Sequence, residues 1–183
     1  DIHFGNDAPF SIELVEGRIN TDLANNLGNL LSRTSQLVDK FFAGKRPAFR
    51  NDDGSSIALR DAAIRLSTEV KREIEEERPS YALEKIMLVL TQANKYLEEK
   101  APWKMAKVDP AQAGHVLATV LEVARIATVL LSPVMPDKTA EILRRLGTTE
   151  NSWNSASTWG LIKEGTTIEK GEPIFPRLDL MKK

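Results

Sequence analysis

Four polar side chains are predicted to share one side of the second helix, where they can bind a single ligand. They are Asn25, Asn29, Arg33 and Gln36. Counting about 100° per residue along a helix places this group opposite the apolar stripe centred on Leu27. Asn29 and Arg33 are four residues apart, so both can reach one nucleotide, and a cytosine edge or its phosphate suits such a pair. A solvated helix face explains the same pattern without a ligand, and the pattern alone favours that simpler interpretation.

A tryptophan in a basic setting is a second candidate for ligand binding. Trp103 directly follows Pro102 in "EEKAPWKMAK", and the nearby lysines are Lys95, Lys100, Lys104 and Lys107. An exposed indole that stacks on an unpaired base contributes about 1–3 kcal/mol, and lysines pair with phosphates. The alternative is a core tryptophan that closes the end of a bundle, and the residue types alone favour this alternative.

The composition excludes several kinds of site. A net charge of −1 rules out a strongly basic coat for nucleic acid, although a local basic groove remains compatible with it. The chain has no cysteine, and its two histidines, His3 and His115, are far apart, so we expect no metal site. We find no glycine-rich phosphate loop, nucleophile elbow or HExxH pair, and nothing that supports a catalyst acting alone.

Apolar periodicity, caps and helix breakers predict an all-α bundle of about five long helices over residues 1–147. The predicted helix starts are, in chain order, Ser11, Asn20 or Thr21, Ser55 or Ser56, Ser80, and Asp109 with Pro110. A last helix follows Pro136 and ends at Gly147. Residues 148–183 are rich in turn residues and end in an extended stretch with two prolines, so we expect an irregular C-terminal strap there.

Other features of the sequence are explained by the fold and not by a ligand. Asn94 falls in the apolar stripe of its helix, so we expect it to be hydrogen-bonded to a neighbouring element. His115 is expected at the surface or at a helix cap. The run "VLATVLEVARIATVLL" is interrupted by Glu122 and Arg125 and is shorter than a membrane span, which predicts a buried helix. The opening "DIHFGNDAPFS" lacks the features of a signal peptide, so we expect a soluble intracellular domain.

Four longer segments, in order, carry a resemblance to a known family. They are "RINTDLANNLGNLLSR", "ANKYLEEKAPWKMAK", "LLSPVMPDKTAEILRRLG" and "EKGEPIFPRL". Together they resemble the C-terminal anticodon-binding domain of bacterial methionyl-tRNA synthetases, over nearly the whole chain. The Gly-Asn-Leu-x-x-Arg and Ala-Pro-Trp pieces separate it from the valyl, isoleucyl, leucyl and cysteinyl relatives, which share the class Ia helix bundle.

The resemblance implies a role for the polar residues described above. In the family, the residues that match Asn29 and Arg33 contact the first anticodon base, cytosine, and the one that matches Trp103 stacks on anticodon bases. The expected ligand is therefore the CAU anticodon of methionine tRNA, both initiator and elongator. Supporting or phosphate contacts are expected from Asn25, Gln36, Pro102, Lys104 and Lys107.

The resemblance also implies what this chain does not contain. The catalytic domain of such an enzyme, which uses ATP and Mg²⁺ to attach methionine, carries His-x-Gly-His and Lys-Met-Ser-Lys-Ser motifs that are absent here. Lys104-Met105-Ala106-Lys107 lacks the serine and is not that loop. We therefore expect no cofactor and no activity of this chain alone, a catalytic domain of the same enzyme as partner, a cytoplasmic location, and neither membrane nor DNA binding.

In the family, the strap returns toward the catalytic domain, which implies that Ile174, Phe175 and Arg177 lack their docking surface here. Two other functions remain open at this point. One is the anticodon domain of a sister class I synthetase, which would prefer another anticodon. The other is a helical protein-interaction module, which would show no salt-sensitive binding of tRNA.

Overall fold

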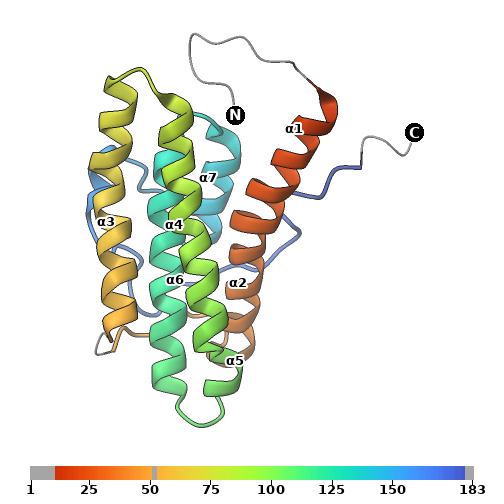
Figure 1. Ribbon diagram of the computed structural model, residues 1–183. Coiled ribbons are helices and arrows are strands. Elements are labelled where there is room, and N and C mark those ends of the chain that lie inside the picture. The colour runs from red at the N-terminus through yellow and green to blue at the C-terminus, as the bar shows by residue number, and fades with distance from the viewer. Residues whose placement is uncertain (1–10, 51–52, 180–183) are drawn as a thin grey trace.

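The computed structural model describes residues 11–50 and 53–179, and it shows a bundle of helices (Figure 1). Three long helices lie side by side: α3 (Gly54–Glu75), α4 (Pro79–Lys100) and α6 (Pro110–Leu131). The shorter elements are α1 (Ile12–Arg18), η1 (Ile19–Gly28), α2 (Asn29–Phe42), α5 (Pro102–Met105), α7 (Pro136–Arg145) and η2 (Trp153–Ser157). The predicted all-α class is confirmed, since the β pairing within the described ranges is a single bridge between Lys45 and Thr167.

The segment that carries Asn29 and Arg33 is one continuous run of helical turns, α1–η1–α2. Ser11 caps it as predicted, because its hydroxyl accepts a hydrogen bond from the Leu14 amide. The predicted break at Asn20 or Thr21 does not occur. Instead η1 is a π-helix, a form that is rare and frequently found at functional sites. Gly28, the last residue of η1, has little room for a side chain, since a Cβ there would lie 3.0 Å from the Leu23 carbonyl oxygen.

Helix α6 forms the centre of the core. All of its residues from Ala113 to Leu131 are buried, under α2, α3, α4, α7 and η2. Its 22 residues are long and apolar enough to cross a membrane by length and composition alone, so the prediction that it is too short was wrong. The prediction of a buried helix is confirmed. His115 is buried as well, contrary to expectation, and its Nδ1 accepts a hydrogen bond from the Arg50 amide.

An ion pair inside α6 ties the strap to the bundle. Glu122 and Arg125 are both fully buried and 2.7 Å apart. The Glu122 carboxylate also accepts hydrogen bonds from the Leu161 and Ile162 amides, and the Arg125 guanidinium donates to the carbonyls of Ser155 and Thr158. The two charges that interrupt the apolar run are therefore the anchor of the chain that follows the bundle.

The end of the strap also packs on the bundle, which corrects the expectation that its docking surface is missing. Ile174 and Phe175 are buried in the common core, and Phe175 lies against Gly28. Lys138 of α7 donates to the Ile174 carbonyl oxygen. Arg177 pairs with Asn25 of η1. The strap is thus part of this fold, and it reaches the polar helix that concerns the site.

Candidate nucleic-acid interface

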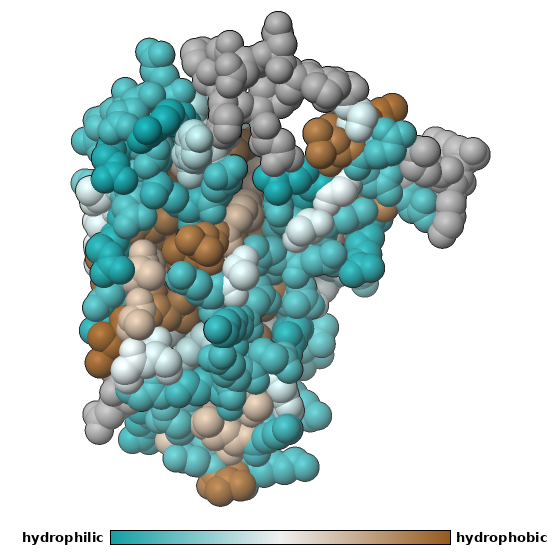
Figure 2. Space-filling model, in the orientation of Figure 1, coloured by the Kyte–Doolittle hydropathy of each residue, from teal (hydrophilic) through white to brown (hydrophobic). Residues whose placement is uncertain are grey.

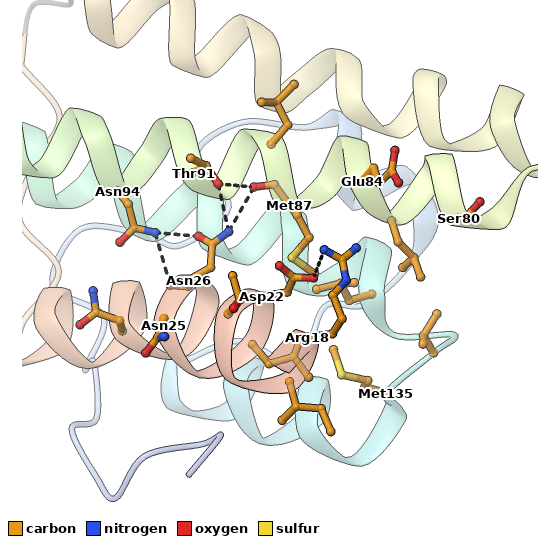
Figure 3. A pocket seen from close by; sticks show the side chains of 18 of the residues that line it. Arg18, Asp22, Asn25, Asn26, Ser80, Glu84, Met87, Thr91, Asn94 and Met135 are labelled. Carbon is orange, nitrogen blue, oxygen red and sulfur yellow. Dashed lines mark hydrogen bonds and ion pairs between the residues drawn. The ribbon is translucent and has the colours of Figure 1, made fainter. Parts of the chain in front are cut away.

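A groove of about 880 Å³ runs between the α1–η1–α2 segment and α4, and the turn between α6 and α7 closes one side of it. Its floor is largely apolar and includes Leu23, Leu83, Met87 and Met135. Polar residues line its walls, and Figure 3 shows several of them between the two helical segments. In the space-filling view, apolar residues are visible between largely hydrophilic rims (Figure 2). Such a surface fits a ligand with flat apolar faces and polar edges, which describes a nucleotide base.

Three of the four predicted polar residues line this groove together. They are Asn25, Asn29 and Arg33. The amide of Asn29 is half-buried and makes no hydrogen bond to any residue that the structure describes, so it can bind a ligand. Gln36 does not line the groove, and its side chain donates to the Ser32 hydroxyl. The helical count therefore grouped three residues that line the groove with one, Gln36, that does not.

Trp103 lies next to Arg33 although the two residues are 70 positions apart in the chain. The Arg33 guanidinium carbon is 5.3 Å from the centroid of the indole ring. Ala101 adopts a left-handed conformation with φ 44°, which reverses the chain from α4 into α5. Pro102 is buried at the first position of α5, and Trp103 after it is half-buried, with part of the indole exposed. The proline and this reversal thus place the indole at the rim of the bundle, beside the polar helix.

Glu98 lies beside Arg33 in the structure, and it was missed when the sequence was interpreted. Its carboxylate forms an ion pair with the Arg33 guanidinium at 2.7 Å, and 63% of its side chain is exposed. A signal was available, because Glu98 follows Asn94 by four residues and therefore shares the face of α4 that meets η1. The guanidinium thus has both an anionic and an aromatic partner.

The four lysines near Trp103 fall into two groups. Lys95 is paired with Glu99, and Lys100 with Asp53. The bond from Lys100, with further hydrogen bonds from Ser55 and Ser56, holds the pKa of Asp53 well below its usual range. Lys104 and Lys107 are exposed and have no ion pair among the described residues. These two lysines are therefore the ones available to an external phosphate.

A set of amides fixes the distance between the two walls of the groove. The Asn94 amide nitrogen donates to Asn26 Oδ1 at 2.8 Å, and Asn26 Nδ2 donates to Thr91 Oγ1 at 3.1 Å and to the Met87 carbonyl oxygen at 3.2 Å (Figure 3). The prediction that Asn94 ties its helix to a neighbour is confirmed. Asn26 was missed because its partners come from α4, more than 60 residues away.

Comparison with known proteins gives the family of this chain. Residues 56–180 match the model of the anticodon-binding domain of methionyl tRNA ligase. The chain belongs to this family. It is 38% identical to a methionine–tRNA ligase of Caldanaerobacter subterraneus subsp. tengcongensis over 186 residues, covering 100% of this chain and 29% of that protein. Methionine–tRNA ligase 1 of Bacillus cereus is also 38% identical, covering 98% of this chain and 28% of that protein.

Solved structures of methionyl-tRNA synthetase have the same fold. A Mycobacterium tuberculosis structure in complex with methionyl-adenylate is 35% identical, with a TM-score of 0.90 over 96% of this chain and 35% of that chain. The apo form of the same enzyme also has a TM-score of 0.90, over 97% of this chain. The methionyl-tRNA synthetase resemblance found in the sequence is therefore confirmed. The chain spans less than a third of the length of the curated relatives that it matches.

Proposed function

We propose that this chain binds the CAU anticodon of initiator and elongator methionine tRNA at the end of the groove lined by Asn29 and Arg33, where Trp103 lies next to Arg33. The observation that supports this most strongly is the position of the Arg33 guanidinium, 5.3 Å from the ring of Trp103. A planar fork of donors next to a partly exposed indole provides both the edge and the face contacts that an unpaired base requires.

Each residue has a distinct part in this proposal. Trp103 stacks on an anticodon base, which contributes about 1–3 kcal/mol. Arg33 and Asn29 hydrogen-bond the edge of the first anticodon base, cytosine. A wrong base leaves these polar groups unpaired, at a cost of about 1–3 kcal/mol for each good pair of contacts. Supporting contacts come from the exposed Lys104 and Lys107 to phosphates, and from Asn25 on the wall of the groove.

Glu98 gives the free site its resting arrangement. Its carboxylate holds the guanidinium of Arg33 in place beside Trp103. When RNA binds, an oxygen of the base or of a phosphate replaces the carboxylate as the partner of Arg33. The exchange is inexpensive because exposed ion pairs contribute only about 0–1 kcal/mol.

The proposed role is one of binding, and bond making belongs to another part of a longer enzyme. In that enzyme a catalytic domain attaches methionine to the tRNA, with ATP and Mg²⁺ bound there and not in this chain. The present domain holds the anticodon so that the acceptor end reaches the catalytic domain. We place such an enzyme in the cytoplasm, where its tRNA substrate occurs.

Titration of this chain with a labelled anticodon stem-loop that carries CAU tests the proposal, at two salt concentrations. We expect binding that weakens as salt rises, because lysines and arginines meet phosphates. Arg33→Ala should weaken binding about tenfold, and Arg33→Lys should not restore it, because an ammonium lacks the planar fork. Arg65→Ala removes the same charge from an exposed position of α3 and serves as the control.

Two outcomes would contradict the proposal. Tighter binding to a stem-loop with a different anticodon would indicate the specificity of a sister synthetase. An absence of salt-sensitive RNA binding would favour a protein-interaction module.

A further inference from the structure

The end of the strap contacts the polar helix through one charged side chain. Both Nε and Nη2 of Arg177 donate hydrogen bonds to Asn25 Oδ1, at 3.1 and 2.6 Å. Asn25 lies on η1, lines the groove and precedes Asn29 by four residues. The strap therefore reaches across the fold to the wall of the proposed anticodon site.

The chemistry of this contact fixes the orientation of the Asn25 amide. A guanidinium has only donors, so the amide must turn its oxygen toward Arg177. The amide nitrogen is then directed away from Arg177, and it makes no hydrogen bond to any residue that the structure describes. Asn25 consequently offers two N–H donors, and no acceptor, to a ligand in the groove.

Two anchors hold Arg177 in position. On one side of it, Phe175 is buried against Gly28 of η1. On the other side, Asn20 Oδ1 accepts a hydrogen bond from the Leu178 amide at 2.8 Å, and Asn20 Nδ2 donates to the Leu178 carbonyl oxygen at 3.0 Å. The strap is thus attached to η1 both before and after Arg177, so the guanidinium is already in place before a ligand arrives.

We propose that Arg177 is a positioning residue for RNA binding, which acts by fixing the Asn25 amide so that its nitrogen donates to an acceptor on the anticodon loop. The acceptor is a base carbonyl, a ring nitrogen or a ribose oxygen. This inference rests on the proposed function, since it requires RNA in the groove. It makes the strap a contributor to recognition through a residue that need not touch the RNA.

A double-mutant cycle tests this proposal with the 183-residue chain and the CAU stem-loop. Asn25→Ala removes the donors and should weaken binding roughly three- to tenfold, as expected for one hydrogen bond. Arg177→Ala lets the amide turn and should weaken binding by a similar factor. Because both changes remove the same interaction, the double variant should bind no more weakly than Asn25→Ala alone.

Conservative and control variants complete the experiment. Arg177→Lys should restore most of the binding, because an ammonium also only donates and so keeps the amide oriented. Lys163→Ala removes the same charge from an exposed strap residue whose side chain, within residues 11–50 and 53–179, bonds only the Gly160 carbonyl oxygen, and it should leave binding unchanged. Circular dichroism confirms that each variant is folded.

The possible contrary results are distinct from one another. If the two single effects multiply in the double variant, Arg177 contacts the RNA itself and the positioning role is wrong. If Arg177→Ala has no effect while Asn25→Ala weakens binding, Arg177 does not set the amide, and if neither matters, Asn25 does not meet the RNA. If the wild-type chain fails to bind the stem-loop at all, the proposed function fails, and this inference with it.

Discussion

At the scale of single residues, the arrangement around Arg33 is what the proposed function relies on for RNA binding by a nearly neutral chain. The guanidinium has an aromatic ring 5.3 Å from its carbon and a carboxylate 2.7 Å away. The ring offers a stacking face, whereas the carboxylate is an anion where RNA phosphates are expected to approach. Under the proposed function, recognition on this surface depends on a few placed donors rather than on bulk charge.

A substitution at Glu98 separates the effect of its negative charge from the effect of its hydrogen bond to Arg33. Glu98→Gln keeps an oxygen that can accept the hydrogen bond from Arg33 but removes the negative charge. We expect the variant to bind the CAU stem-loop about two- to fivefold more tightly at low salt, because repulsion of phosphates is lost. The gain should shrink as salt screens the charge. Weaker binding in a fluorescence titration at every salt concentration would show that the ion pair itself is needed.

Helical periodicity predicted part of the site at this scale. Asn25, Asn29 and Arg33 belong to one helical segment, so counting along it placed them on a common face. Glu98 and Arg177 could not be found in this way, because they reach that face from α4 and from the strap, 65 and 152 positions away in the chain. Spacing on α4 places Glu98 on the same face as Asn94, but which elements meet that face, or meet Arg177, depends on packing that spacing does not describe.

At the scale of elements, the amides between η1 and α4 join the two walls of the groove, and the cap of α3 joins α3 to the end of α4. Asp53 accepts hydrogen bonds from the Ser55 and Ser56 amides and pairs with Lys100 at the end of α4. This cap was predicted at Ser55 or Ser56 instead. The sequence signal was ambiguous because serine and aspartate both cap helices well.

The cap should make stability depend on pH. Because the folded-state pKa of Asp53 is lowered, its stabilising contribution is complete above about pH 5 and is lost as pH falls through that pKa. We expect Asp53→Ala to reduce the free energy of unfolding by about 1 kcal/mol at pH 7. Asp53→Asn keeps a capping oxygen and should cost less. Urea denaturation at pH 7 and pH 3 measures both, and an equal loss at the two pH values would refute the assignment.

The hydrogen bonds of the amides between η1 and α4 should stabilise the fold, whereas an exposed side chain on the same helix should contribute little. Asn94→Ala removes the hydrogen bond to Asn26 Oδ1, and we expect a loss of about 1–2 kcal/mol in urea denaturation. The control is Gln92→Ala, an exposed position on the same helix, which should stay within about 0.5 kcal/mol of the parent chain. Equal effects of the two substitutions would mean that Asn94 is not a tie between the elements.

The sequence did not predict that η1 is a π-helix. The segment has apolar residues at helical spacing, so a regular helix or a break near Asn20 was the simplest expectation. The structure instead packs Phe175 against Gly28 and pairs Asn20 with Leu178. Contacts with the strap, which lies more than 140 residues later in the chain, accompany this local geometry.

At the scale of the whole molecule, the buried ion pair of α6 makes the strap and the bundle one unit. Breaking a buried pair by removing one partner costs about 3–5 kcal/mol, because the other charge stays buried. Glu122→Ala should reach this range, since Arg125 loses its partner and the Leu161 and Ile162 amides lose their acceptor. Glu172→Ala, at an exposed strap residue, is the control and should cost less than about 0.5 kcal/mol.

Thermal denaturation and limited proteolysis measure this prediction. We expect Glu122→Ala to lower the midpoint and to open the region after residue 148 to cleavage. A loss below about 1 kcal/mol with no new cleavage would show that the strap does not depend on the pair. The sequence predicted a buried α6 and a strap, but it could not show that Glu122 and Arg125 join the two, because their partners are backbone groups that no residue type reveals.

The central claim is that this fold presents Trp103 and its neighbours to the anticodon of methionine tRNA. The most direct measurement compares the CAU stem-loop with one changed only at the first anticodon base, for the parent chain and for Trp103→Ala, with circular dichroism to confirm folding. We predict that the base change and the substitution each weaken binding about tenfold, equivalent to about 1.4 kcal/mol. Clear binding that is indifferent to both changes would contradict the account, because the RNA would then be held through its backbone elsewhere on the surface.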